Sequence, residues 1–160
     1  MKNIADDLRG IITKAAAALK DVNNEEASTP PAPGKWSKKQ ILGHLIDSAG
    51  NNQQKFVRTM AETSVDFVGY AQEHWVDSQR YNDVDWNELI GFWRSFNLHL
   101  AHIIENVDPK LLSNTITINE SGPFTLEFIM ADYNEHLKHH LKQILPETDL
   151  ESNFKNIYND

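Results

Sequence analysis

The chain has 160 residues, 40% hydrophobic and 24% charged, with a formal net charge of −8 and no cysteine. This length suffices for one domain with an apolar core, and the acidic balance argues against nucleic acid or anionic lipid as partners, because both are bound through clustered Lys and Arg. Without cysteine there are no disulfides, thiolate metal sites or cysteine nucleophiles, so any metal chemistry falls to His, Asp and Glu.

The chain also lacks the usual signals for export or membrane insertion. Its first turns carry charged residues, and no apolar run resembles a signal peptide. No stretch approaches the ~18 uncharged apolar residues of a membrane span. We therefore expect a cytoplasmic protein.

Apolar residues recur at helical spacing in the N-terminal third. The first predicted helix runs from about residue 3 to 22, and the Pro-rich stretch 23–35 is predicted to be a loop. Ser37 with Gln40 forms the capping-box pattern, in which each side chain bonds the other residue's backbone N–H. A second helix is therefore predicted from Ser37 to about Met60.

The helical pattern breaks over residues 61–84, which we interpret as a long ordered loop. Asp85 with Glu88 then forms a second capping-box pattern and begins the third helix. That helix carries a heptad typical of helix bundles, and Asp108-Pro109 ends or kinks it. The heptad residues are Leu89, Trp93, Phe96, Leu100, Ile103 and Val107.

After the third helix, Thr115–Ile118 has the alternation of a short extended segment, and Gly122-Pro123 indicates a turn. Thr125 is predicted to cap a fourth helix that ends before Pro146. Four amphipathic helices bury their apolar faces best against one another. The predicted fold class is therefore all-α: a four-helix bundle over residues 1–146 with a long loop between its second and third helices, followed by a tail or short helix at 147–160.

Two histidines lie on the predicted apolar face of the last helix. His136 and His140 are four residues apart, so their Cβ atoms lie ~6 Å apart on one side of the helix and the two imidazoles can bind one metal ion. Such pairs are also common as core or surface histidines, so the pair alone is a weak signal.

His44 lies at the edge of the apolar face of the second helix. A single histidine there is more often a core or boundary residue with a satisfied hydrogen bond. Burying three inward histidines on two helices, however, costs free energy unless something binds their lone pairs. The sequence therefore predicts one divalent metal ion bound by His44, His136 and His140. Three protein ligands would leave one coordination position open, as in catalytic sites.

The remaining histidines have simpler interpretations. His139 is off the seam of the last helix and is expected to point outward, although its position beside His140 would let it compete as a ligand. His99 and His102 flank the heptad and are expected to be solvent-facing or boundary residues. His74, in the long loop, is either exposed or part of a lid.

Two segments of the sequence together resemble the DinB-like superfamily, over about residues 1 to 146. They are Gly34-Lys-Trp-Ser-Lys-Lys-Gln-Ile-Leu-Gly-His-Leu-Ile-Asp47 and Asp132-Tyr-Asn-Glu-His-Leu-Lys-His-His-Leu-Lys-Gln-Ile144. Within that superfamily, the two segments are similar to the branch of the YfiT-like metal-dependent hydrolases and bacillithiol S-transferases. The resemblance implies a bundle with zinc or nickel on His44, His136 and His140, frequently in a homodimer, and a low-molecular-weight thiol as cosubstrate.

Two further residues are candidates for catalysis at such a centre. Asp47 follows His44 by one helical turn and could orient an imidazole or accept a proton, with a solvated helix carboxylate as the alternative. Tyr133 precedes His136 by one turn and could present its hydroxyl to the pocket, with a core tyrosine as the alternative. A metal ion would lower the pKa of a thiol or water bound at its open position, and this ligand would then be a nucleophile near neutral pH.

Three functional classes fit these observations. The first, which the resemblance favours, is a thiol S-transferase acting on small electrophiles. The second is a metal-dependent hydrolase in which water replaces the thiol. The third is a non-catalytic bundle that binds a metal or ligand. In each case the expected partner is a small molecule.

Overall fold

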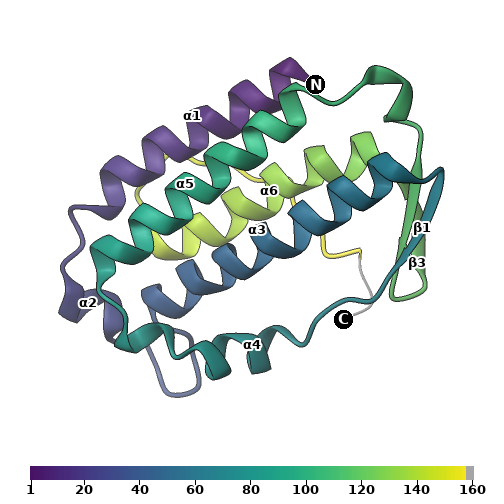
Figure 1. Ribbon diagram of the computed structural model, residues 1–160. Coiled ribbons are helices and arrows are strands. Elements are labelled where there is room, and N and C mark those ends of the chain that lie inside the picture. The colour runs from purple at the N-terminus through teal and green to yellow at the C-terminus, as the bar shows by residue number, and fades with distance from the viewer. Residues whose placement is uncertain (158–160) are drawn as a thin grey trace.

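The computed structural model describes residues 1–157, and the four predicted long helices are present among them. They are α1 (Lys2–Leu19), α3 (Lys38–Ala61), α5 (Trp86–Glu105) and α6 (Leu126–Ile144). Both α1 and α3 pack against α5 and α6, so α1 and α3 lie diagonally across the bundle (Figure 1). The shared interior is filled with apolar side chains, including Phe56, Trp86 and Trp93. The predicted four-helix bundle is confirmed.

The helix starts follow the capping residues seen in the sequence. The Ser37 hydroxyl accepts from the Gln40 backbone N–H, and the Gln40 side chain accepts from the Ser37 backbone N–H, which completes the capping box. The Asp85 carboxylate accepts two backbone N–H groups at the start of α5, and Thr125 accepts from Phe128 N at the start of α6. These bonds satisfy N–H groups that have no partner within a helix.

The connecting segments hold more regular structure than predicted. The predicted loop at 23–35 contains the short helix α2 (Asn24–Ser28), whose N-cap Asn23 accepts from Glu26 N. The predicted long loop at 61–84 contains β1 (Ser64–Phe67), α4 (Gln72–Gln79) and the 3₁₀ turn η1 (Tyr81–Asp83). Elements of three to eight residues complete too few periods for apolar spacing to reveal them.

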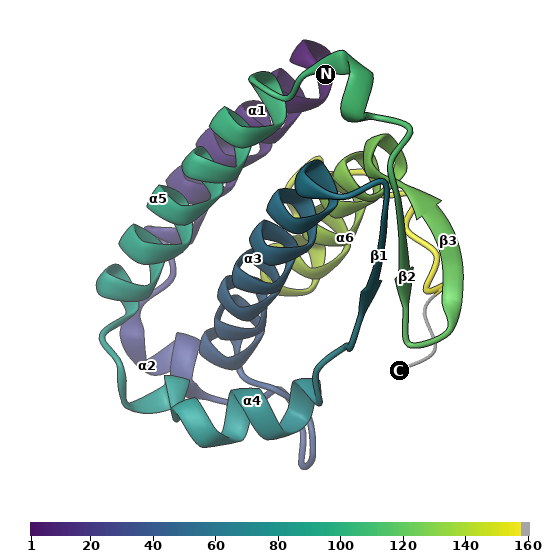
Figure 2. The same cartoon turned by 45° about the vertical axis from the view of Figure 1, so that its right-hand side comes forward.

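A three-stranded sheet lies beside the bundle where α3 ends and α6 begins (Figure 2). β2 (Thr115–Ile118) is the extended segment predicted from sequence, and it pairs in parallel with β1 and antiparallel with β3 (Ser121–Thr125). The turn predicted at Gly122-Pro123 is wrong. The chain reverses at Asn119 and Glu120, with φ of 45° and 69°, the left-handed conformations that two-residue hairpins use.

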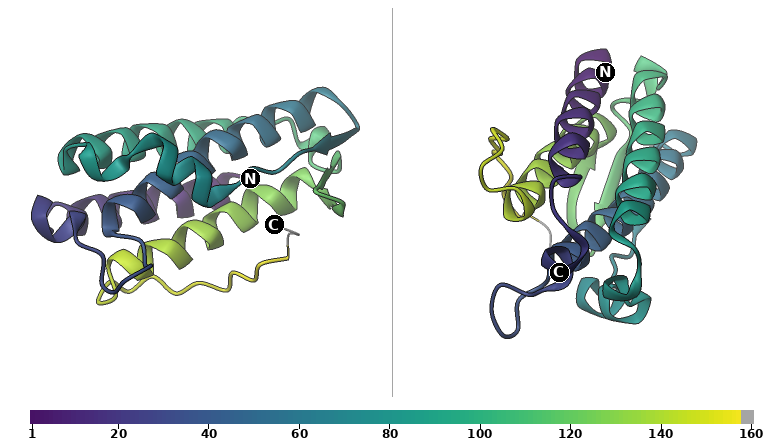
Figure 3. Two further views of the ribbon diagram at one scale, coloured as in Figure 1. Left: turned by 90° about the horizontal axis from the view of Figure 1, so that it is seen from below. Right: turned by 90° about the vertical axis from the view of Figure 1, so that its left-hand side faces the viewer.

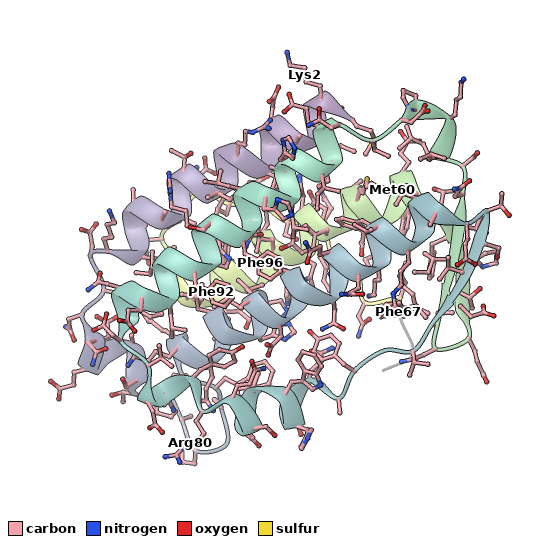
Figure 4. All side chains as sticks on the ribbon, in the orientation of Figure 1. Lys2, Met60, Phe67, Arg80, Phe92 and Phe96 are labelled. Carbon is pink, nitrogen blue, oxygen red and sulfur yellow. The ribbon has the colours of Figure 1, made fainter. Side chains whose placement is uncertain are left out.

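The buried face of α5 differs from the predicted heptad. Asn97 and Ile104 are fully buried, whereas Phe96 and Ile103 are only partly buried and Phe92 is 55% exposed. Figure 4 labels Phe92 and Phe96, whose rings stack one turn apart along α5. Because α5 packs against both α1 and α3, its buried face is wider than a two-helix seam.

After α6 the chain turns back and runs along that helix, which is clearest from below (Figure 3, left). Residues 145–157 form no helix. The predicted tail begins in this segment, and its last residues, 158–160, lie outside the described part of the chain. Within residues 1–157, no helix is both long and apolar enough to cross a membrane.

Candidate metal centre

The three histidines singled out from the sequence converge in the structure. One imidazole nitrogen from each of His44, His136 and His140 lies within 4.8 Å of the others. The ring centroids are 5.4 Å apart for His44 and His136, 4.6 Å for His44 and His140, and 4.5 Å for His136 and His140. The Nε2 atoms of His44 and His136 are 3.4 Å apart. Two helices distant in sequence thus aim three imidazoles at one point.

Local sequence explains this convergence. Every residue from 41 to 49 is buried, because α3 packs against α5, α6, α4 and η1, and His44 in the middle of this stretch is 1% exposed. On α6, four residues advance the helix by slightly more than one turn, so His136 and His140 occupy one side of it. That side borders α3.

The environment keeps all three imidazoles neutral. Burial lowers the pKa of His44 to about 3 and that of His140 to about 4, with a smaller contribution from a neighbouring histidine in each case. The pKa of His136 is also well below its ordinary value, mainly through burial, then through His140, His44, His139 and Lys55. A neutral imidazole has a free lone pair, which metal coordination requires.

The donor set fits a divalent ion. Two metal–nitrogen bonds of about 2.0–2.1 Å at a tetrahedral angle would place their nitrogens roughly 3.3–3.4 Å apart, and the Nε2 atoms of His44 and His136 are 3.4 Å apart. The Nδ1 atoms of His44 and His140 are buried with no hydrogen-bond partner, so neither ring is oriented by a protein bond through that nitrogen. Coordination of a metal by one nitrogen of each ring would offset part of the cost of burying these rings.

A cavity of about 280 Å³ opens onto the histidines. Polar and apolar side chains share its wall, and the residues with polar groups include Ser48, Asn52, Lys55, Tyr70, Gln72 and Asn119. A larger hollow of about 430 Å³ lies between α1 and α6 and is lined by none of the histidines. The smaller cavity is the one that joins a candidate metal centre to a space for a small ligand.

Several residues around the centre were not predicted from the sequence. Ser48 Oγ lies 3.5 Å from His136 Nδ1 and accepts a hydrogen bond from Asn52 Nδ2. The Trp36 ring lies 5.4 Å from that of His44, and the Phe154 ring 5.1 Å from that of His136. Ser48 could have been found, because it follows His44 by four residues on one helix face. Trp36 and Phe154 come from loop segments whose position no periodicity indicates.

Asp47 is buried at 4% exposure and does not line the cavity. Its Oδ1 accepts from the Tyr81 hydroxyl at 2.6 Å and from Gln79 Nε2 at 2.7 Å, while its buried Oδ2 has no hydrogen-bond partner. Burial raises the pKa of this carboxyl, partly offset by the two hydrogen bonds. Asp47 therefore fastens α4 and η1 to α3, and it is not the solvated carboxylate considered as the alternative.

Tyr133 contributes to the cavity wall, but its hydroxyl is engaged in the bundle interior. It donates to Asn97 Oδ1 at 2.6 Å, and Asn97 Nδ2 donates to the Trp93 carbonyl. We expect Tyr133→Phe to lower the free energy of unfolding by about 1–3 kcal/mol, because Asn97 Oδ1 would be buried without a donor. Urea denaturation measures this change, and metal content should be unaffected. A variant with parental stability would contradict the role of this bond.

The other histidines lie outside the three-imidazole cluster. His139 is exposed, as predicted, and its ring lies 5.0 Å from that of His140 at the cavity rim. His99 and His102 are exposed and stack on each other along α5. His74 is exposed in α4 beside Ser78.

The low pKa values of the cluster predict a pH-dependent stability of the metal-free protein. Between about pH 4 and 6.5 the unfolded chain binds protons that the folded histidines exclude, so the free energy of unfolding falls as pH falls through this window. The slope is up to about 1.4 kcal/mol per pH unit for each such histidine. Urea denaturation from pH 7 to 4.5 measures it. His136→Gln should reduce the slope by about 1.4 kcal/mol per pH unit, the contribution of one proton. An unchanged slope in this variant would contradict the assignment.

Known proteins resemble this chain in sequence and in fold. The family model described as the DinB superfamily matches residues 8–144. A Bacillus mycoides (strain KBAB4) protein named as a candidate metal-dependent hydrolase is 26% identical over 141 residues, covering 86% of this chain and 79% of the relative. A Bacillus cereus (strain ATCC 10987 / NRS 248) protein with the same description is 26% identical over 142 residues, covering 87% and 78%.

One solved structure shares the fold. YfiT from Bacillus subtilis, described as a probable metal-dependent hydrolase with an unusual four-helix bundle topology, superposes with a TM-score of 0.81. The match covers 90% of this chain and 83% of YfiT at 18% identity, so it compares the folds and not the activities.

Proposed function

This chain belongs to the DinB superfamily, and we propose that it is a metal-dependent enzyme that acts on a small molecule through an ion held by His44, His136 and His140. The observation that carries the proposal is the convergence of three neutral imidazoles, with one nitrogen of each within 4.8 Å of the others, at the wall of a cavity. Imidazole donors suit zinc and nickel, which we take as the first candidates.

When bound, the ion would supply a Lewis acid with a position left open by its three protein ligands. The other features of the site come from the chain's own residues. Burial keeps the imidazoles neutral, and Ser48 lies beside Nδ1 of His136. Lys55, Asn52 and Gln72 give the cavity polar groups that can orient a substrate.

We propose transfer of a low-molecular-weight thiol to a small electrophile as the first reaction. The thiol must be a cosubstrate, because the chain has no cysteine. Hydrolysis is the second candidate, and the names of the two Bacillus relatives favour it. The two reactions need the same centre and differ in the nucleophile that enters the cavity.

The test is a comparison of turnover with thiol and with water. Tag-free, metal-loaded protein is incubated with bacillithiol or glutathione and monochlorobimane, and in parallel with a panel of esters. Conjugate formation that His140→Ala abolishes and His99→Ala retains supports thiol transfer, and ester cleavage with the same dependence supports hydrolysis. If neither exceeds the His140→Ala background, the proposal of an enzyme is rejected and a non-catalytic metal-binding bundle remains.

Asp47 and Tyr133 enter this proposal as positioning residues. Asp47 holds α4 and η1 against the helix that carries His44, and Tyr133 links α6 to α5 one turn before His136. Their direct participation in catalysis stays a prediction from the sequence. So do the homodimer, the cytoplasmic location and the lack of nucleic-acid and membrane partners.

A further inference from the structure

The segment that follows α6 forms one side of the histidine cavity. It turns back along α6 (Figure 3, left), and both Phe154 and Asn156 line the cavity. The matched family region ends at residue 144, so this wall is built by residues beyond it.

Several contacts hold this segment in place. Leu150 is buried in the apolar core at 5% exposure, and Lys14 Nζ donates to the Asp149 carbonyl. Further along, Ser152 Oγ donates to the Glu135 carbonyl at 2.7 Å, and Asn153 N donates to Glu135 Oε2 at 2.6 Å. Glu135 directly precedes His136, so the segment is attached to α6 at the candidate metal centre.

Phe154 is the apolar part of this wall. Its backbone N donates to Ser152 Oγ at 3.0 Å, which fixes the residue close to the attachment point. Its ring lies 5.1 Å from the His136 ring, nearly perpendicular at 75°, and 5.6 Å from the His139 ring. Phe154 therefore lies against one of the proposed ligands, in a cavity that is lined by both polar and apolar side chains.

We propose that Phe154 is a specificity-determining residue, which limits the bulk of the ligand that can reach the three-histidine centre. The inference rests on the proposed function. The cavity, at about 280 Å³, falls just below the ~300–1,000 Å³ common for small-molecule sites. A ring fixed against His136 thus restricts the site to compact substrates, and a large group next to the reacting atom is excluded.

Two ligands with the same donor atom and different size test this inference. Cobalt(II)-loaded protein is titrated with imidazole and with 4-phenylimidazole, and binding is followed by the visible spectrum of the cobalt. Phe154→Ala should strengthen 4-phenylimidazole binding on the order of tenfold, as expected when a steric obstacle is removed from a pocket, with little change for imidazole. Phe92→Ala, which removes an exposed phenylalanine from α5, should leave both affinities unchanged.

A second readout needs no metal. In the metal-free protein, diethyl pyrocarbonate should modify His136 several-fold faster in Phe154→Ala than in the parent or in Phe92→Ala, as mapped by mass spectrometry. If Phe154→Ala does not fold, Phe154→Leu replaces it, with smaller changes in the same direction.

Equal changes for the two imidazoles, or no change in either readout, would overturn the inference. Failure of the parent to bind cobalt would instead overturn the proposed function, and the modification rates would still decide whether Phe154 covers His136.

Discussion

Alanine at position 44, 136 or 140 is expected to strip the purified protein of its metal. The parent should contain about one equivalent per chain and each variant below ~0.1, because two imidazoles without the third hold a divalent ion far more weakly. All three substitutions should have this effect, since each residue offers one nitrogen to the same cluster. Elemental analysis of tag-free protein measures the effect, and tag removal matters because a polyhistidine tail binds the same ions.

The matched control is His99→Ala, which removes an exposed histidine from α5. Its metal content should equal that of the parent. Folding of each variant is checked by far-ultraviolet circular dichroism, so that metal loss is not confused with unfolding. Retention of a full equivalent by all three folded cluster variants would reject the metal centre.

Gly43→Ala is expected to lower the free energy of unfolding by about 1–3 kcal/mol, the usual cost of forcing extra atoms into a packed interior. A Cβ at residue 43 would overlap the ring of Tyr81. The ring cannot move alone, because its hydroxyl is bonded to Asp47. Displacing it would leave the buried Asp47 carboxylate with Gln79 as its remaining hydrogen-bond donor.

Gly91→Ala is the matched control, since it makes the same change on a helix with open space around the new Cβ. It should raise the free energy of unfolding by up to about 1 kcal/mol, because alanine favours a helix over glycine. Urea denaturation of the two variants compares the effects directly. Stabilisation by both substitutions would show that Tyr81 does not constrain α3.

Gly43 also bears on the metal centre, because it directly precedes His44. Displacement of Tyr81 would loosen the attachment of η1 to α3 at Asp47, one turn beyond His44. We therefore expect Gly43→Ala to weaken metal binding as well, unlike Gly91→Ala. Positioning of the cluster thus depends on close packing between α3 and the segment that follows α4.

Much of the bundle could be predicted from the sequence, because the signals are local. Ser37, Asp85 and Thr125 each cap the helix that their side chains predicted, since capping needs only a few neighbouring residues. The spacing of His136 and His140 also determined, without any tertiary information, that both rings share one side of α6. By contrast, α2, α4 and β1 were missed because they are too short to show a period.

Only the tertiary structure decided which residues surround the histidines. Asn97 is buried where the heptad favoured Phe96, because α5 packs against two helices at once. Asp47 bonds Tyr81 and Gln79 in segments that have no long-range signal in the sequence.

At the candidate centre, too, the sequence determined some features and the tertiary structure determined others. Helical periodicity placed His44 at the edge of the apolar face of its helix, and His136 and His140 together on the apolar face of theirs. The distance between these two groups, and the return of the chain that places Phe154 against His136, depend on how separate segments pack. A one-dimensional pattern specifies which side of an element is apolar, whereas contacts between elements far apart in sequence are set by the packing of the whole core.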